Sequence, residues 1–190
     1  MSGAASPKQA MDRVARGIQR CRRCERSGTR GHAVPGEGSV ESGILLLGEA
    51  PGKKEDRTAR PFVGRAGSYL DQIFLRHPVE REKMFVTSIL KCYHPDSPKK
   101  DQVEACRPWT EKQIGILRPE IILVMGRTAE QGLWGMTQGG GESFRKWEGI
   151  PCVVTCHPAA AMRFPRRHEQ FDRDFGCFVR IVREKGLLDG

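Results

Sequence analysis

Four short apolar runs constrain the fold of this 190-residue chain more than any other feature. They are ILLLG (44–48), MFVTSIL (84–90), IILVMG (121–126) and IPCVVTCH (150–157). Runs this short and this continuously apolar are typical of strands buried on both faces of a parallel sheet. Because segments with helical periodicity separate them, the sequence predicts an α/β fold. We expect a three-layer α/β/α sandwich around a central, mainly parallel sheet of four strands.

The segments between and around these runs predict the helices. Those expected after the first strand are 68–77, 101–117, 127–135 and 171–187. Pro108 lies inside the second and should break or kink it. An earlier helix is expected after Ser6-Pro7, which has the pattern of an N-cap followed by a proline at the first helical position. The apolar residues at helical spacing after it are Met11, Val14 and Ile18.

Length and hydrophobicity bound the class of protein. The chain is long enough for one domain with a full core, and 38% of its residues are hydrophobic. No apolar run approaches the roughly 20 residues that a membrane helix needs, and the N-terminus lacks the apolar centre of a signal peptide. We therefore expect a soluble, cytoplasmic single domain over residues 1–190, with flexible ends at 1–8 and 188–190 and no membrane partner.

The charge of the chain suggests a polyanionic partner. Lysine and arginine number 32 against 23 acidic residues, which gives a formal net charge of +9. Nucleic acid is the leading partner that such an excess indicates. An ordinary basic surface, an anionic membrane or an anionic metabolite remain open from charge alone.

Polar residues follow the ends of the predicted strands. Open α/β sheets bind ligands just beyond the carboxyl ends of their strands. The segments that should converge there are 48–52, 88–92, 126–127 and 157–158. The first belongs to a long glycine-rich loop, GEAPGKKEDRTARPFVGRAG (48–67). This loop lacks the spacing of a phosphate-binding P-loop and of a GxGxxG dinucleotide motif, so it predicts a pocket wall or a plain connection.

Seven cysteines are present, and an odd number in a cytoplasmic chain argues against a disulfide framework. Cys21 and Cys24 form the motif CRRC, and Cys92 and Cys106 lie far along the chain. These four can hold zinc or an iron–sulfur cluster, or can be unrelated thiols, and spacing alone does not decide. The other three are expected to be small buried apolar residues: Cys152, Cys156 and Cys177.

Taken together, the motifs are more specific than any one of them. GEAPG, EDRTARPFVGRAG, FVTSILKC, ACRPW, MGRTA and GIPCVVTCHPAA occur in this order. The combination resembles the uracil-DNA glycosylase superfamily, and in particular its iron–sulfur branch, family 4, over roughly residues 10–180. The resemblance implies a monomeric, monofunctional enzyme that flips uracil out of single- or double-stranded DNA and leaves an abasic site.

The resemblance also implies roles for residues of the pocket. Glu49 would support the hydrolytic step and His157 would contact the uracil O2, as the two catalytic residues. Phe62 would stack on the base, and Glu55 would close the pocket near the uracil C5. Arg163, with Met162 beside it, would enter the minor groove. The loop backbone that approaches the base would be Gly48, Ala50, Pro51 and Gly52.

For the cysteines, the resemblance implies a structural [4Fe–4S] cluster. Its four ligands would be Cys21, Cys24, Cys92 and Cys106.

Two positions depart from the family pattern. Ser88 stands where the family usually has an asparagine that hydrogen-bonds the edge of uracil. Lys91-Cys92 is followed by Tyr93-His94-Pro95 instead of Arg-Pro-Pro. A sister branch that bonds covalently to the abasic sugar carries a basic insert near GKRRIH, which HPDSPKKD (94–101) does not match. That covalent chemistry is therefore not expected here.

Other functions remain open at this point. A glycosylase of the same superfamily with hypoxanthine or xanthine as its main substrate is the nearest alternative, because Ser88 alters the base contact. An electron-transfer protein, a zinc-stabilised DNA-binding module and a non-catalytic iron–sulfur DNA-binding protein account for the cysteines but require neither PFVG nor HPAA.

Overall fold

The computed structural model describes residues 5–135 and 143–188. Its centre is one sheet with the strand order β1-β3-β2-β4-β6-β5. The strands are β1 (Glu37–Gly38), β2 (Ile44–Gly48), β3 (Phe85–Ser88), β4 (Ile121–Met125), β5 (Phe144–Trp147) and β6 (Ile150–Thr155). The four predicted strands are β3, β2, β4 and β6, and they are parallel to one another, as expected.

The predicted strand count of four is wrong, because an antiparallel strand is added at each edge of the sheet. β1 has only two residues, too few to form a pattern. β5 reads FRKW, in which only Trp147 is buried. A search for continuous apolar runs cannot detect such edge strands, because one of their faces meets water.

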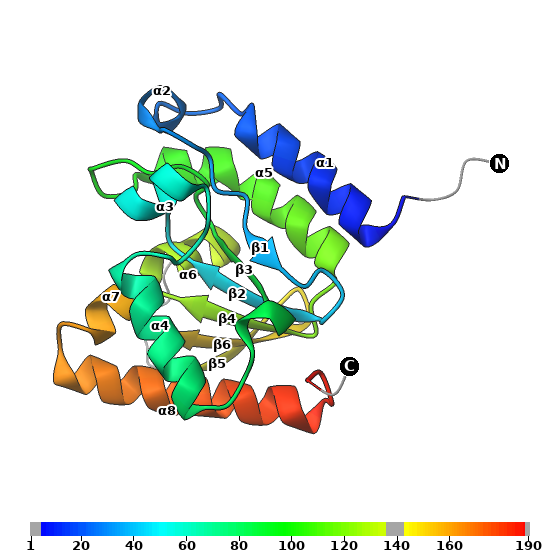
Figure 1. Cartoon of the computed structure of the whole chain (residues 1–190), viewed down its shortest axis with the longest axis vertical. Coiled ribbons are helices and arrows are strands. Elements are labelled where there is room, and N and C mark those ends of the chain that lie inside the picture. Colours follow the sequence, from blue (N-terminus) through cyan, green and yellow to red (C-terminus); the bar gives the residue numbers. More distant parts are fainter. Residues whose placement is uncertain (1–4, 136–142, 189–190) are drawn as a thin grey trace.

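Helices cover both faces of the sheet (Figure 1). They are α1 (Pro7–Gln19), α2 (Arg26–Thr29), α3 (Lys53–Thr58), α4 (Arg65–Arg76), the 3-10 helix η1 (Arg81–Lys83), α5 (Lys100–Leu117), α6 (Arg127–Trp134), α7 (Pro158–Ala161) and α8 (Pro165–Glu184). Leu46 and Leu123 pack toward α4 and α8, whereas Leu45 and Leu47 pack toward α1, α5 and α6. Alternate strand residues thus feed two cores, which confirms the three-layer architecture.

The N-terminal helix begins where the sequence predicts. Ser6 is the N-cap of α1, and its hydroxyl accepts from the Gln9 amide while Gln9 reaches back to the Ser6 amide. Met11 and Ile18 are buried. The expected flexibility at 1–8 and 188–190 falls in part on residues 1–4 and 189–190, which lie outside the described residues.

Three helices differ from the predicted ones. The first is α4, which begins at Arg65, three residues before the predicted start at 68. α5 runs through Pro108 without ending, so the expected break there is wrong. Pro108 has no amide hydrogen, so the Glu104 carbonyl one turn earlier lacks its usual donor. Glu104 lies on an exposed side of the helix, where water can donate instead. α8 begins at Pro165, six residues before the predicted start at 171. The prediction missed this first part of the helix because the segment PRRHEQ carries no apolar periodicity. Within the described residues, no helix is long and apolar enough to span a membrane.

Candidate active site

A pocket of about 390 Å³ lies at the carboxyl ends of the parallel strands. The loop after β2, the end of β3 and the loop after β6 all contribute to it. The backbone amides of Ile89 and Leu90 donate to the carbonyls of Gly48 and Glu49 at 2.9 and 3.0 Å, which joins the first two of these segments. The predicted residues that line the pocket are Ala50, Pro51, Gly52, Glu55, Phe62, Ser88 and His157.

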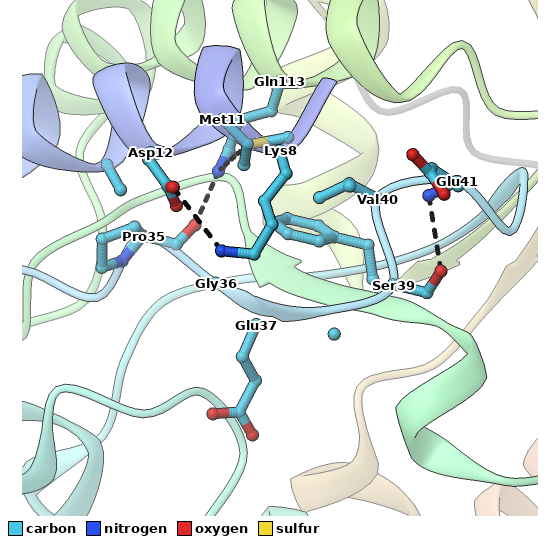
Figure 2. Close-up of a pocket in the computed structure, with 13 residues that line it drawn as sticks. Lys8, Met11, Asp12, Pro35, Gly36, Glu37, Ser39, Val40, Glu41 and Gln113 are labelled. Atoms are coloured by element: carbon cyan, nitrogen blue, oxygen red, sulfur yellow. Dashed lines mark hydrogen bonds and ion pairs between the residues drawn. The ribbon is translucent and has the colours of Figure 1, made fainter. Parts of the chain in front are cut away.

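A second cavity of about 420 Å³ lies elsewhere, between α1 and β1 (Figure 2). It contains Phe85, the first residue of β3, and so lies toward the amino ends of the parallel strands. Figure 2 shows Lys8 pairing with Asp12 and Gln113 donating to the Pro35 carbonyl across it. None of the predicted site residues lines it, so the pocket at the carboxyl ends is the candidate active site.

Glu49 comes directly after β2 and is half-buried. One of its carboxylate oxygens, Oε2, accepts a hydrogen bond from the Thr128 hydroxyl at 2.6 Å. Its negative charge acts on the His157 imidazole, as does that of Glu55. The structure therefore brings the two predicted catalytic residues, Glu49 and His157, into one electrostatic environment.

His157 is the N-cap of α7, and its Nδ1 accepts from the Ala159 amide at 3.2 Å. Because Nδ1 accepts, the neutral ring carries its proton on Nε2. Burial lowers the His157 pKa below its ordinary value of 6.5, while the two nearby carboxylates oppose this shift. At neutral pH the side chain is therefore an uncharged imidazole with one N–H free to donate.

Phe62 has a left-handed backbone, with φ of 49°. Its ring lies against the Gly48 backbone, where an added Cβ would come within 2.3 Å of the ring. It faces the His157 ring with a centroid separation of 6.2 Å and an angle of 29° between the planes. Gly48 therefore leaves room for the Phe62 ring. The positive φ of Phe62 is one that a non-glycine residue adopts only when its neighbours hold it there.

Two charged side chains hold the Phe62 loop. Glu55 accepts from the amides of Val63 and Gly64 at 2.8 and 2.6 Å and from that of Gly52 at 3.1 Å. Arg81 donates to the carbonyls of Phe62 and Pro61 from the other side. The Glu55 carboxylate thus binds backbone amides of the pocket wall. Arg81, which was not among the predicted site residues, holds the same loop through its carbonyls.

Ser88 ends β3 at the pocket, with 5% of its surface exposed. Beneath it lies Lys91, which is fully buried and donates to the Ser88 carbonyl, the Thr87 hydroxyl and the Gln113 side chain. Burial lowers the pKa of Lys91 to about 7. Lys91 was not among the predicted site residues, and it fixes the strand end that presents Ser88.

The four predicted cysteine ligands line one small cavity between the end of α1 and α5. The Arg30 guanidinium donates to the Cys92 sulfur at 2.9 Å, and the Trp109 indole donates to the Cys21 sulfur at 3.2 Å. Burial raises the pKa of Cys106 to about 11, and the positive charge of Lys91 opposes this shift. Burial raises the pKa of Cys92 as well, so both sulfurs favour the protonated thiol, and the positive charges of Arg30 and Lys91 oppose these shifts.

The donor set that these four cysteines form bears on the kind of group that they could hold. Among residues 5–135 and 143–188, no three histidine, cysteine or acidic side chains are placed to hold a metal ion. Four cysteine thiols around one cavity are a donor set that both zinc and iron–sulfur clusters take.

The other three cysteines lie apart from this cavity. Cys152 is fully buried on β6, as predicted, and burial raises its pKa to about 12. Cys156 and Cys177 are only half-buried. The prediction of full burial is therefore confirmed for Cys152 and wrong for the other two.

Arg163 does not line the pocket. It is exposed in the turn between α7 and α8, just beyond the pocket rim. Its neighbours Met162 and Phe164 are 39% and 58% exposed. Phe164 was not predicted, because a lone aromatic between charged residues gives no periodic signal. Three exposed basic residues that do line the pocket were also missed: Lys53, Lys54 and Arg65.

Comparisons with known proteins agree with this geometry. Residues 35–180 match the profile of the Uracil DNA glycosylase superfamily. A type-4 uracil-DNA glycosylase of Pyrobaculum aerophilum is 35% identical over 174 residues, which is 85% of this chain and 89% of the relative. One from Archaeoglobus fulgidus is 31% identical over 180 residues, 88% and 90% of the two chains. One from Thermotoga maritima is 31% identical over 166 residues, 82% and 85% of the two chains.

Proposed function

Because the chain belongs to the uracil-DNA glycosylase superfamily and to its type-4 group, we propose that it removes uracil from DNA by hydrolysing the N-glycosidic bond. The observation that carries this proposal is the convergence of Phe62, Ser88 and His157 on one pocket, with Glu49 beside it. The product would be free uracil and an intact strand with an abasic site. An electron-transfer protein would need no such pocket.

Base flipping would precede the chemistry. A base stacked in a duplex cannot reach a pocket lined by side chains and loops, and extruding it costs a few kcal/mol. Stacking on Phe62 would offset part of that cost, since an aromatic–base stack contributes roughly 1–3 kcal/mol. The clamp by Glu55 and Arg81 supports this role, because it fixes the Phe62 loop before the base arrives.

Cleavage would place negative charge on the uracil and positive charge on the sugar. The Nε2–H of neutral His157 is the donor that would stabilise the charge growing on a uracil oxygen. The Glu49 carboxylate would stabilise the cationic sugar and orient the attacking water. None of the predicted catalytic residues is a lysine, so the reaction would end at the abasic site without cutting the strand.

Contacts to the DNA backbone would come from the basic residues around the pocket. The net charge of +9 supports a binding affinity that weakens with salt. Met162 and Phe164 are exposed apolar side chains beside Arg163, and such side chains can wedge into the gap left by a flipped base. The enzyme would act as a monomer in the cytoplasm, on single- or double-stranded DNA.

We also propose that Cys21, Cys24, Cys92 and Cys106 hold a [4Fe–4S] cluster. Four thiols around one cavity, with N–H donors from Arg30 and Trp109 to two of the sulfurs, support this assignment. The cluster would be structural. It would close the long chain segment between Cys24 and Cys92 and so restrict the unfolded chain.

Replacing Cys92 by alanine is expected to remove the iron and make the protein insoluble, because the cluster loses a ligand and the fold loses its cross-link. Iron and acid-labile sulfide, measured per chain, check this. Cys177→Ala is the matched control, because Cys177 lies on α8 away from the cavity, and it should keep both. Full iron content in Cys92→Ala would refute the ligand assignment, and zinc in the wild-type protein would refute the cluster.

Ser88 is expected to loosen base discrimination. An asparagine amide offers a donor and an acceptor that match the N3–H and O4 of uracil, whereas a serine hydroxyl is shorter and can do either. A lost matched hydrogen bond costs on the order of 1 kcal/mol. Uracil activity should survive, discrimination should be weaker than the family norm, and hypoxanthine should be tolerated.

The substitution Ser88→Asn tests this expectation. It should raise the ratio of the uracil rate to the hypoxanthine rate by about fivefold, the equivalent of one such hydrogen bond. Ser97→Asn, at an exposed serine outside the pocket, should leave the ratio unchanged. If Ser88→Asn changes neither rate, Ser88 does not face the base.

The proposed function itself is tested with four oligonucleotides that carry uracil, hypoxanthine, xanthine or a thymine mismatch. After incubation with the protein, alkali cuts any strand that has an abasic site. Cutting of the uracil strand supports the proposal. If only the hypoxanthine or xanthine strand is cut, that base and not uracil is the main substrate. If no strand is cut, the proposal that the protein is a glycosylase is rejected.

A further inference from the structure

Thr128 is the side chain that contacts the catalytic carboxylate. Its hydroxyl donates to Glu49 Oε2 at 2.6 Å, within the range of a charge-assisted O–H···O hydrogen bond. The other carboxylate oxygen, Oε1, has no hydrogen bond within the part of the chain that the structure describes. The contact thus holds one oxygen of Glu49 and leaves the other for the reaction.

The position of Thr128 on α6 explains why its hydroxyl is available. Thr128 is the second residue of α6, which starts directly after β4, next to β2. A threonine that follows a turn of helix can bond a carbonyl of that turn, as Thr58 at the end of α3 does with the Lys54 carbonyl. Thr128 has no preceding helical turn, so its hydroxyl points outward to Glu49 at the end of β2.

The start of α6 also contacts His157. Gly126, with φ of 98°, precedes the helix, and an added Cβ there would come within 3.0 Å of the His157 Cβ. Its amide donates to the Thr155 carbonyl on β6 at 2.9 Å. The start of α6 therefore lies against both proposed catalytic side chains.

We propose that Thr128 is a positioning residue for Glu49, an inference that rests on the proposed glycosylase function. The hydroxyl fixes the rotamer of the carboxylate so that Oε1 faces the sugar and the water. Without this bond the side chain samples other rotamers, and fewer enzyme molecules hold the reactive geometry. Loss of this hydrogen bond therefore lowers the excision rate of the enzyme–DNA complex and leaves the affinity for DNA unchanged.

The test compares Thr128→Val with Thr128→Ser in single-turnover excision at saturating uracil DNA. Valine keeps the shape but lacks the hydroxyl, and it should lower the rate at least about tenfold with a DNA dissociation constant within about twofold of wild type. Serine keeps the hydroxyl and should retain most of the rate. Thr155→Val is the matched control, because the buried Thr155 hydroxyl has no hydrogen-bond partner in the described structure.

A double variant separates positioning from general damage. In a Glu49→Ala background, Thr128→Val should cause no further loss, because the group that Thr128 positions is gone. Thermal melting monitors folding, and Thr128→Ala supplies a second variant without the hydroxyl. A Thr128→Val rate within twofold of wild type, a Thr128→Ser rate as low as that of valine, or a loss that persists in Glu49→Ala would each overturn the inference. If the wild type releases no uracil, the proposed function fails with it.

Discussion

Replacing Glu49 by glutamine is expected to slow single-turnover uracil excision at least ~100-fold, the scale of one electrostatic group at a reacting centre. Glutamine keeps the size and still accepts from the Thr128 hydroxyl, so the change removes mainly the negative charge. That charge matters most when the sugar becomes cationic, so the loss should appear in the rate and not in DNA affinity.

Quenched gel assays give the rate, and fluorescence anisotropy with a non-cleavable uracil analogue gives the affinity. Glu41→Gln is the matched control, since Glu41 is an exposed loop acid that does not line the pocket. A Glu49→Gln rate within threefold of wild type would remove Glu49 from the mechanism.

Replacing His157 by alanine is expected to cause a loss of similar size, at least ~100-fold, because it removes the donor to the developing anion. The wild-type rate should also depend on the charge of His157. Its pKa is lowered by burial below 6.5, so the neutral donor predominates at pH 7 and the proton is gained only as pH falls below 6.5.

Protonation puts a hydrogen on Nδ1, which then no longer accepts from the Ala159 amide, and the cap that orients the ring is lost. The wild-type rate should therefore hold down to about pH 6.5 and fall below it. NMR titration of the histidine rings gives the His157 pKa directly. A value above 6.5, or His157→Ala with a wild-type rate, would contradict the assignment.

The rule that ligands bind beyond parallel strand ends explains why part of the site could be predicted. Ala50, Ser88 and His157 lie at or just beyond the ends of three different strands, and the structure brings them to one pocket. The family motifs added Phe62, which is far along the sequence from any strand end although its ring packs against Gly48. These predictions depend on the order of the elements along the chain, which the apolar runs reveal.

The supporting contacts could not be predicted, because they join segments that share no pattern. Arg81 lies in a charged stretch that reads as surface, yet it holds the Phe62 carbonyl. Glu55 was predicted to close the pocket near the uracil C5, but its hydrogen bonds to three backbone amides were not predicted. Thr128 reads as an ordinary helix residue. Each of these contacts forms only where segments that are separate in the sequence come together in the fold, and no local sequence pattern indicates that.

In the fold too, some elements could be predicted from the sequence and others could not. Strands buried on both faces were predicted within three residues at each end, because burial leaves only apolar residues available. The edge strand β5 was missed, because one of its faces is in water and its sequence is mostly charged or exposed. The early start of α8 was missed for the same reason, since Arg166 and Arg167 are exposed in its first turn.

We expect this pocket to hydrolyse the bond between uracil and the sugar. Mass spectrometry of one reaction mixture tests it most directly, by counting free uracil, intact abasic strand and protein after incubation with a single-uracil oligonucleotide. Equal amounts of free uracil and uncut abasic strand are expected, with unmodified protein. Neither product should form with a Glu49→Gln, His157→Ala double variant over the same time. An absence of free uracil, a strand cut without alkali, a covalent protein–DNA adduct, or full activity in the double variant would contradict it.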